Sequence, residues 1–549
     1  MKTTNKVQGV STFRWDTTYT TTYKMMNESI RKYSSSPTEF SNHDKPVSIS
    51  KALETGKLLN YQSVHKLLSS VSAQATVFLD GTWDQWTLEL MGNGNLIFMR
   101  LPIKTGTIEM PGFETGDLSG GYVVAQIKLQ VIHTGSDEKS VVLGEEKTPE
   151  MEVSIYKCCF PNVEEGSYSD LLAEGTFKDY LNSEDVIEQF KYVFSTASIN
   201  DKATGDFAWL TPSDLSYAVF APDSGATEEN SLYSMLCMTD NNVAPPDIQK
   251  SVDSEVFKGI TEEANAVLCI SPQKFCEHVL IDASRGFIMD TLVSDYAYST
   301  DGTEVYNVND ITMKNVVVDD GKKVDLQIKA GNYRIRIMND HLETFITDAT
   351  YHEDLYNVYI TFNQNIGFET QKNGEDTIFI PKEGDYYDAV SHVSVEPTEM
   401  GETLQWVGIA FDILCGLLTI AGATLAIVAR VGTTTTRVTV EAATASIAAE
   451  TVAVEAAADG IATGVTAGVS ITNKLFIGAG VCILLGVAFE LAPKMAIALA
   501  YEKYDEIPTL ENFSKNLLSQ LKWTGIKEAE LMGARLNDAF LLDFKTIVE

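Results

Sequence analysis

The histidines and carboxylates of this 549-residue chain are the side chains that could hold a metal ion or transfer protons. Two pairs stand close in the sequence: His341 with Glu343, and His352 with Glu353. Neither pair has the spacing of a recognised zinc-ligand motif, so we predict no metal site. The seven histidines are otherwise dispersed, at positions 43, 65, 133, 278, 341, 352 and 392.

Catalytic motifs are missing from the sequence. It has no Gly-x-Ser-x-Gly elbow, no Walker A loop, no dinucleotide-binding glycine pattern and no His-Glu-x-x-His. No carboxylate pair stands out among 76 acidic residues. Asp240, Asp319 and Asp320 lie in predicted turns, where aspartate is expected for backbone reasons alone. We therefore expect a protein that is not an enzyme and needs no cofactor.

Residues 404–500 differ from the rest of the chain, because they are rich in Ala, Gly, Val, Ile, Leu and Thr and poor in charge. Residues 413–429 and 475–489 carry no charge at all. As a helix, the first of these runs would rise about 25 Å, a little less than the hydrocarbon core of a bilayer. Two buried helices, or a hairpin accessible to lipid, therefore agree with the sequence better than permanent transmembrane helices.

The large apolar side chains of this region are the candidates for contact with lipid or a membrane. If the hairpin inserted, the acidic linker between its helices would have to cross or refold, at a cost of several kcal/mol. Gly460, Gly464 and Gly468 form a small-residue ladder, which we interpret as close packing within a water-soluble core. The candidates are Trp406, Phe411, Leu414, Leu417, Leu418, Leu425, Phe476, Ile483, Leu484 and Leu485.

The net charge of −35 and the isoelectric point near 4.5 argue against nucleic acid as a partner. The charge is uneven, because residues 1–66 hold ten Lys and Arg against five acidic residues. A basic N-terminal face could meet anionic headgroups or an acidic partner. We prefer the simpler interpretation that it pairs with the acidic surface of the chain itself.

The N-terminus lacks the apolar core of a signal peptide. If the protein leaves its cell, we expect it to do so without an ordinary cleaved signal. The seven cysteines are odd in number and scattered, so they predict no disulfide framework. Cys415 and Cys482 lie in the apolar runs, where cysteine behaves as a small hydrophobic residue.

Secondary structure is predicted from periodicity and turn residues. A β-like run at 11–22 leads into a helix at 23–33, where Tyr23, Met26, Ile30 and Tyr33 recur at helical spacing. Further helices are predicted at 53–68, 185–194 and 508–523. Turns are predicted at Asp80-Gly81 and at residues 92–94 and 135–137. Strands are predicted at 75–79, 86–90, 95–101, 121–132, 150–156, 215–220, 232–238, 311–318, 323–328, 332–337, 355–362 and 376–380.

These elements suggest three regions. Residues 1–160 combine helix with antiparallel sheet, residues 161–400 are rich in strands, and residues 401–549 hold the apolar helices and a C-terminal helix and strand. No internal repeat or long disordered linker separates them.

Several short motifs, in order along nearly the whole chain, resemble the clostridial P-forty-seven family. This family is encoded in the OrfX type of botulinum neurotoxin gene cluster and in related insecticidal operons. The matching residues are Trp15, Asp16 and Tyr19, then Trp83, Trp86 and Pro102, then Trp209, Pro212, Tyr217 and Cys237, and finally Trp523, Arg535 and Asn537. Trp15, Trp83 and Trp209 are expected to be core aromatic residues rather than ligands.

The resemblance implies an α+β, TULIP-like (tubular lipid-binding) fold, in which long helices are wrapped by a strongly curved antiparallel sheet. It also implies a non-enzymatic toxin-cluster protein that binds lipid or other proteins of the same cluster and contributes to insecticidal activity. Two alternatives stay open: an autonomous pore-forming insecticidal toxin that uses the apolar helices of residues 404–500, and a structural partner or chaperone of another toxin component.

Overall fold

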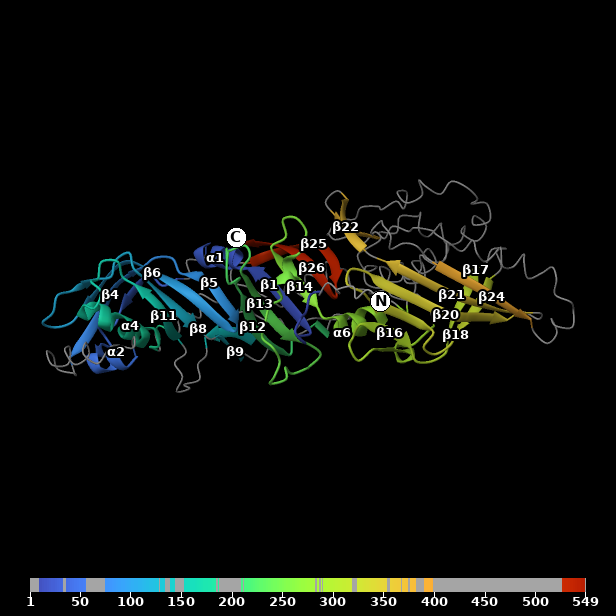
Figure 1. The fold of residues 1–549 in the computed structure, drawn as a ribbon, viewed down its shortest axis with the longest axis horizontal. Coiled ribbons are helices and arrows are strands. Elements are labelled where there is room, and N and C mark those ends of the chain that lie inside the picture. Colours follow the sequence, from blue (N-terminus) through green and yellow to red (C-terminus); the bar gives the residue numbers. More distant parts are fainter. Residues whose placement is uncertain are drawn as a thin grey trace.

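The computed structural model describes about three fifths of the chain. The described residues are 9–32, 36–55, 75–127, 129–133, 139–143, 153–183, 186, 209–210, 212–281, 284–285, 288, 290–317, 323–352, 356–366, 368–373, 376–381, 390–397 and 526–548. Two antiparallel sheets lie end to end along the long axis of the molecule (Figure 1).

The first sheet has 14 strands among the described residues, and its main path has ten. Strands β2 (Glu39–Ser41) and β3 (Val47–Ser48) pair with β4 (Thr76–Trp83). Strands β4 and β7 (Gly116–Asp117) both pair with β6 (Leu96–Glu109). From one edge to the other the main path runs β11 (Val153–Cys159), β8 (Tyr122–Ile127), β6 (Leu96–Glu109), β5 (Thr87–Gly94), β12 (Asp214–Phe220), β13 (Leu232–Met238), β1 (Thr17–Thr22), β14 (Ala266–Ile270), β26 (Ala539–Val548) and β25 (Ile526–Asn537).

The second sheet has eight strands in the described part of the chain. Two hairpins stand apart from both sheets: β9 (Leu129–His133) with β10 (Lys139–Leu143), and β22 (Phe368–Asn373) with β23 (Asp376–Pro381). The eight strands run β15 (Tyr296–Tyr298), β16 (Glu304–Asn307), β19 (Tyr333–Ile337), β20 (Leu342–His352), β18 (Lys323–Ile328) and β17 (Ile311–Val317), with β21 (Tyr356–Ile366) joining β20 to β24 (Val390–Pro397).

Strand β1 lies at the centre of the first sheet, and this central position explains its threonine-rich sequence. All six of its residues are buried, and it pairs with β13 on one side and β14 on the other. β-branched side chains such as threonine favour this extended, enclosed conformation. The predicted helix follows directly as α1 (Tyr23–Lys32), and its stripe of Tyr23, Met26 and Ile30 is buried as expected.

One continuous apolar core joins both sheets, and a second, smaller core lies on the other face of the central strands. Trp83 and Trp209 belong to the first core and Trp15 to the second, which confirms that all three are core aromatic residues. Strands β1, β13 and β14 are therefore covered on both faces. The segment that covers the second face contributes Ile248, Val252 and Val256.

The prediction of long helices is not confirmed among the described residues, whose helices are few and short. The longest helix among the described residues is α4 (Tyr168–Leu181), with 14 residues, and the others are shorter still. The sequence missed α4, because its side chains are buried on most sides and leave no amphipathic period. The remaining helices are α2 (Ile49–Thr55), α6 (Pro272–Phe275), the π-helix η3 (Cys276–Leu280) and the 3-10 turns η2 (Ser254–Phe257) and η4 (Val293–Asp295).

The predicted turn at Asp80 and Gly81 is wrong, because both residues lie within strand β4. The glycine is needed for close packing: a Cβ at Gly81 would overlap the carbonyl oxygen of Thr105 and lie 2.5 Å from the ring of Phe40. Residues 92–94 likewise lie at the end of a strand, β5, and its hairpin with β6 turns at Asn95, one residue later than predicted; Gly92 and Gly94 have positive φ angles. Most strands of the sequence prediction are present, whereas β14, β20 and β24 were missed.

Candidate functional site

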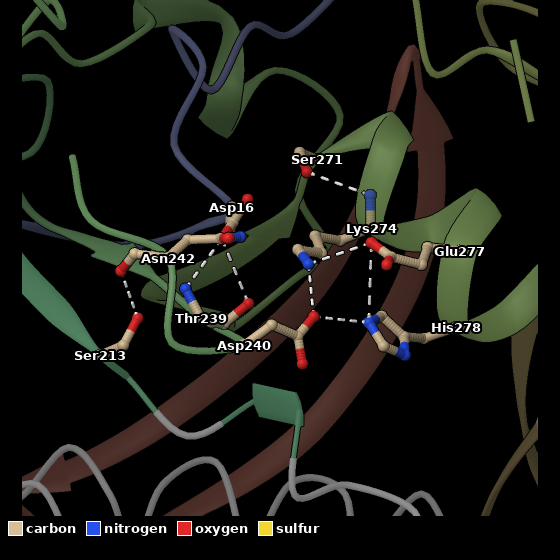
Figure 2. Close-up of polar contacts among 9 residues, drawn as sticks. All are labelled: Asp16, Ser213, Thr239, Asp240, Asn242, Ser271, Lys274, Glu277 and His278. Atoms are coloured by element: carbon tan, nitrogen blue, oxygen red, sulfur yellow. Dashed lines mark hydrogen bonds and ion pairs between the residues drawn. The ribbon is translucent and has the colours of Figure 1, made fainter. Parts of the chain in front are cut away.

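The main polar cluster lies where three strands of the first sheet end. Strand β1 runs antiparallel to β13 and β14, and Thr17 pairs with Cys237 on one side and Ile270 on the other. The residue before β1 and the residues after β13 and β14 therefore meet at one end of these three neighbouring strands. Figure 2 shows the side chains brought together there, from Asp16, from the turn after β13, and from α6 and η3.

Asp16 organises the turn that follows β13. Its buried Oδ2 accepts hydrogen bonds from the backbone nitrogen of Thr239 (2.8 Å), from the hydroxyl of Thr239 (3.3 Å) and from Nδ2 of Asn242 (3.1 Å). The hydroxyl of Ser213 donates to the carbonyl of Asn242 at 2.6 Å (Figure 2). A buried carboxylate with several donors holds the surrounding backbone in one conformation.

Lys274 supplies the positive charge of the cluster. Its side chain is only 3% exposed, and its Nζ contacts the carboxylate of Asp240 and that of Glu277, the latter at 3.0 Å. Nε2 of His278 lies 2.7 Å from Oδ2 of Asp240, the same oxygen that Lys274 contacts (Figure 2). Ser271 caps α6 by accepting a hydrogen bond from the backbone nitrogen of Lys274, which fixes the direction of the helix.

The ionisation of this cluster is set by burial and by ion pairing acting in opposite directions. Burial by itself would raise the pKa of Asp240, but the hydrogen bonds from Lys274 and His278 outweigh it and hold that pKa below its usual range. Burial by itself would lower the pKa of Lys274, but its bonds to Asp240 and Glu277 raise that pKa above the ordinary lysine value. Both groups are therefore charged across the neutral range.

Asp240, Glu277 and His278 are the group of described residues whose donor atoms could hold a metal ion, since these atoms lie within 4.8 Å of one another. One imidazole and two carboxylates would suit a divalent cation. The ammonium group of Lys274, however, already forms ion pairs with both carboxylates. A charged lysine is not a nucleophile and an ionised aspartate is not a proton donor. The contacts of Lys274 with Asp240 and Glu277, and of His278 with Asp240, make the cluster an ion-paired network.

Among the described residues, the other titratable candidates (His341, Glu343 and His352) do not come together in one site. Nδ1 of His341 lies 2.9 Å from Asp340, while Glu343 lies 3.6 Å from Arg336. Nδ1 of His352 lies 2.6 Å from the side-chain oxygen of Asn357. Glu353, Asp319 and Asp320 lie outside the described residues.

Asp240 was correctly predicted in a turn, since it and Asn241 have positive φ angles of 54° and 60°. Its role in an ion-paired cluster was missed. The spacing of Lys274, Glu277 and His278 is that of one face of a helix and could have signalled part of the cluster. Nothing in the sequence links that face to Asp240, because the link depends on the pairing of β1 with two strands.

The ten lipid-contact candidates, from Trp406 to Leu485, all lie outside the described residues, as does the glycine ladder at 460, 464 and 468. Among the residues that the structure does describe, no helix is both long and apolar enough to cross a membrane.

Three of the basic N-terminal residues that the structure describes pair with acids of the same chain, in agreement with the interpretation preferred from the sequence. Arg14 lies 3.3 Å from Asp247, and Lys24 lies 3.6 Å from Glu229. Lys51 forms an ion pair with Asp179. Such exposed pairs are worth about 0–1 kcal/mol each, so they neutralise the surface more than they stabilise the fold.

The five cysteines in the described part of the chain form no disulfide. Burial raises the pKa of Cys269 to about 12 and also raises the pKa of Cys276, so neither thiol is a nucleophile at neutral pH.

Comparison with known proteins gives a consistent result. A family model described as OrfX-like, "Protein OrfX2/OrfX3/P47", matches residues 12–456. P47 of Clostridium botulinum A2 is 13% identical, with a TM-score of 0.57 over 97% of this chain and 98% of that chain. P47 of Clostridium botulinum E1 is 14% identical, with a TM-score of 0.56 over 97% of this chain and 99% of that chain. No curated protein sequence matches the chain.

Proposed function

Because this chain belongs to the OrfX-like family, we propose that it is a non-enzymatic protein of a bacterial toxin gene cluster, which acts by binding another protein of the cluster or lipid. We further propose that it is released from the producing cell and contributes to insecticidal activity. The family match and the resemblance of its motifs support the toxin-cluster role.

The observation that carries the non-enzymatic proposal is the ionisation of the polar cluster. Catalytic groups need pKa values shifted toward the working pH. The pKa values of Asp240 and Lys274 are instead displaced away from neutrality, so each group is held in its charged form. The cluster stabilises the junction of β1, β13 and α6 rather than offering a reactive group.

Lipid binding is the second half of the proposal. It is supported by the apolar sequence of residues 404–500 and by the TULIP-like architecture that the family resemblance implies. The alternative of an autonomous pore-forming toxin rests on the same apolar residues. In the alternative of a structural partner or chaperone, the protein would act only through contacts with another toxin component.

Two measurements on the purified full-length protein separate these functions. In the first, liposome flotation at acidic, neutral and alkaline pH is combined with dye leakage from the same vesicles. Binding without leakage supports a lipid-holding protein, and binding with leakage supports the pore former. In the second, the tagged protein is co-expressed with the neighbouring genes of its cluster. Recovery of a stoichiometric complex without flotation supports protein binding, and failure in both measurements would overturn the proposal.

The pore-forming alternative has its own variants. Leu418→Asp and Leu484→Asp each place a charge in an apolar run and should abolish leakage if those runs insert. Because an aspartate in a buried core costs several kcal/mol, circular dichroism must first show that the variants are folded. Leakage by folded variants at the level of the unmodified protein would exclude these runs as the inserting element.

A further inference from the structure

A small cavity lies between the central strands of the first sheet and the segment that covers their second face, residues 248–256. Its floor is made of small polar side chains from three strands: Thr18 and Thr20 of β1, Ser234 of β13 and Cys269 of β14. The strand register makes them neighbours, because Thr20 pairs with Ser234 and Thr18 pairs with Cys269. The floor therefore carries three hydroxyls and a thiol.

The cover of the cavity also contributes polar groups. Ser251 and Asp253 line the cavity from the covering segment, and most of the remaining lining is valine. The carboxylate of Asp253 is fixed in place by two backbone nitrogens. One oxygen accepts a hydrogen bond from Ser11 at 2.9 Å, and the other accepts one from Glu255 at 3.0 Å. Each carboxylate oxygen has a second acceptor site, so Asp253 can accept a further hydrogen bond.

The floor hydroxyls have hydrogen-bonding capacity that their protein partners do not use. All the floor side chains are buried, and those of Thr20 and Ser234 are each only 1% exposed. The hydroxyls of Thr20 and Ser234 lie 2.9 Å apart and share one hydrogen bond, and the hydroxyl of Thr18 bonds to the sulfur of Cys269. A hydroxyl has one donor and two acceptor sites, so acceptor sites are left over on the floor. Buried polar groups of this kind are the ones that internal water satisfies.

The volume and the chemistry of the cavity determine what it can hold. The space open to the centre of a water molecule is about 10 Å³. A cavity needs roughly 10–15 Å³ of such space to hold one water, so a larger ligand does not fit. Empty cavities in proteins are apolar, whereas this one has polar groups on its floor and its cover. We propose that the cavity binds one ordered water molecule, which donates to a floor hydroxyl and to Asp253 and accepts from the hydroxyl of Ser251.

The bound water connects the central strands to the segment that covers them. A water that bridges two protein groups is enthalpically nearly as good as a direct hydrogen bond. The hydroxyls of Thr18 and Thr20 face a core that is otherwise apolar, and the water gives them a partner that the surrounding valines do not offer. The site is separate from the polar cluster around Lys274 and does not depend on the proposed function.

The test is a crystal structure of the full-length protein at a resolution that shows ordered water. We expect one density peak in the cavity, about 2.5–3.2 Å from a floor hydroxyl, from the carboxylate of Asp253 and from the hydroxyl of Ser251. A cavity without density would overturn the proposal. A peak with six or more oxygen ligands at about 2.3–2.6 Å would be a calcium ion, and this result would overturn it as well.

Thr20→Val tests the floor of the cavity. The substitution keeps the shape of the side chain but replaces the hydroxyl with a methyl group, so we expect the density peak to be lost. Thr21→Val is the matched control, because it makes the same change one residue along the strand, where the side chain points to the other face and donates to the carbonyl of Asn265. The peak should persist in this control. A peak that persists in both variants would overturn the proposal, since the floor hydroxyl would not be what binds the water.

Ser251→Ala tests the cover of the cavity. Ser251 is only half-buried, so this variant keeps the proposal testable if Thr20→Val does not fold. Loss of the donor should lower the occupancy of the peak at least about twofold relative to the unmodified protein. Unchanged occupancy would show that the water does not bridge the strands to the cover, and the proposal would fail.

Discussion

The imidazole of His278 stacks flat on the indole of Trp209, with ring centroids 4.3 Å apart and planes within 2° of parallel. This contact joins the segment that precedes β12 to the π-helix at the end of the sheet. Trp209→Ala should lower the free energy of unfolding by about 3 kcal/mol, because it empties a large buried site. Part of this loss should depend on His278: a double-mutant cycle with His278→Ala, followed by urea unfolding, should give a coupling of about 1 kcal/mol. Strict additivity would show that the stacking contributes nothing.

Asp16 is predicted to be a main stabilising residue of the strand junction. Asp16→Ala leaves the donors of Thr239 and Asn242 without their acceptor and should lower the free energy of unfolding by about 3 kcal/mol. Asp247→Ala removes a carboxylate of an exposed ion pair and should change it by less than about 0.5 kcal/mol. Urea unfolding followed by tryptophan fluorescence measures both, and equal effects would contradict the assignment.

We predict that the positive charge of Lys274 is needed to stabilise the carboxylates around it in the folded protein. Lys274→Met keeps much of the side-chain volume but leaves Asp240 and Glu277 without their cation, so we expect a loss of about 2–3 kcal/mol. Lys258→Met serves as the control, because Lys258 is exposed and pairs with Glu255 in a single helical turn. A stabilised Lys274→Met protein would show that the carboxylates do not need a counter-charge.

The same ion pairs predict how stability depends on pH. The pKa of Asp240 is lowered by folding, so its contribution is present above the unfolded-state value near 4 and is lost as pH falls through the folded-state value. The pKa of Lys274 is raised by folding, so its contribution is present below about 10.4 and is lost as pH rises through the folded-state value. The difference in unfolding free energy between the unmodified protein and Lys274→Met should therefore be flat between about pH 5 and pH 9 and shrink outside that window. Denaturant titrations at acidic, neutral and alkaline pH measure this difference, and a maximum at one pH would refute it.

Gly81 is predicted to be intolerant of any side chain despite lying in a strand. Gly81→Ala forces a Cβ against the backbone of Thr105 and the ring of Phe40, and should cost about 2 kcal/mol. Asp80→Ala at the exposed neighbouring position should have little effect. Thermal unfolding of the two variants tests the comparison, and equal melting temperatures would show that β4 can move away from β6.

Local sequence pattern by itself determined several elements of this protein. The stripe of Tyr23, Met26 and Ile30 predicted α1, because helical periodicity is a property of neighbouring residues. The alternation of Val123, Ala125 and Ile127 predicted β8 for the same reason, and all three side chains are buried. The pairing of N-terminal basic residues with the chain's own acids also followed from charge alone.

Tertiary structure decided the features that depend on strands far apart in sequence. Gly81 follows an aspartate and so has the local signature of a turn, but the close approach of β4 to β6 and Phe40 is what requires a glycine there. Residues 539–548 pair with β14, so the C-terminal strands complete the N-terminal sheet. The α4 helix carried no periodic signal because the core surrounds it on most sides.

The polar cluster is the clearest example of a feature that local sequence predicts in part and tertiary structure completes. The sequence placed Asp240 in a turn and could have placed Lys274, Glu277 and His278 on one helical face. Only the pairing of β1 with both β13 and β14 brings these groups within hydrogen-bonding distance. Hydrogen bonds and ion pairs act over a few ångströms, whereas residues 16, 240 and 274 are separated by long stretches of chain, so sequence alone could not join them.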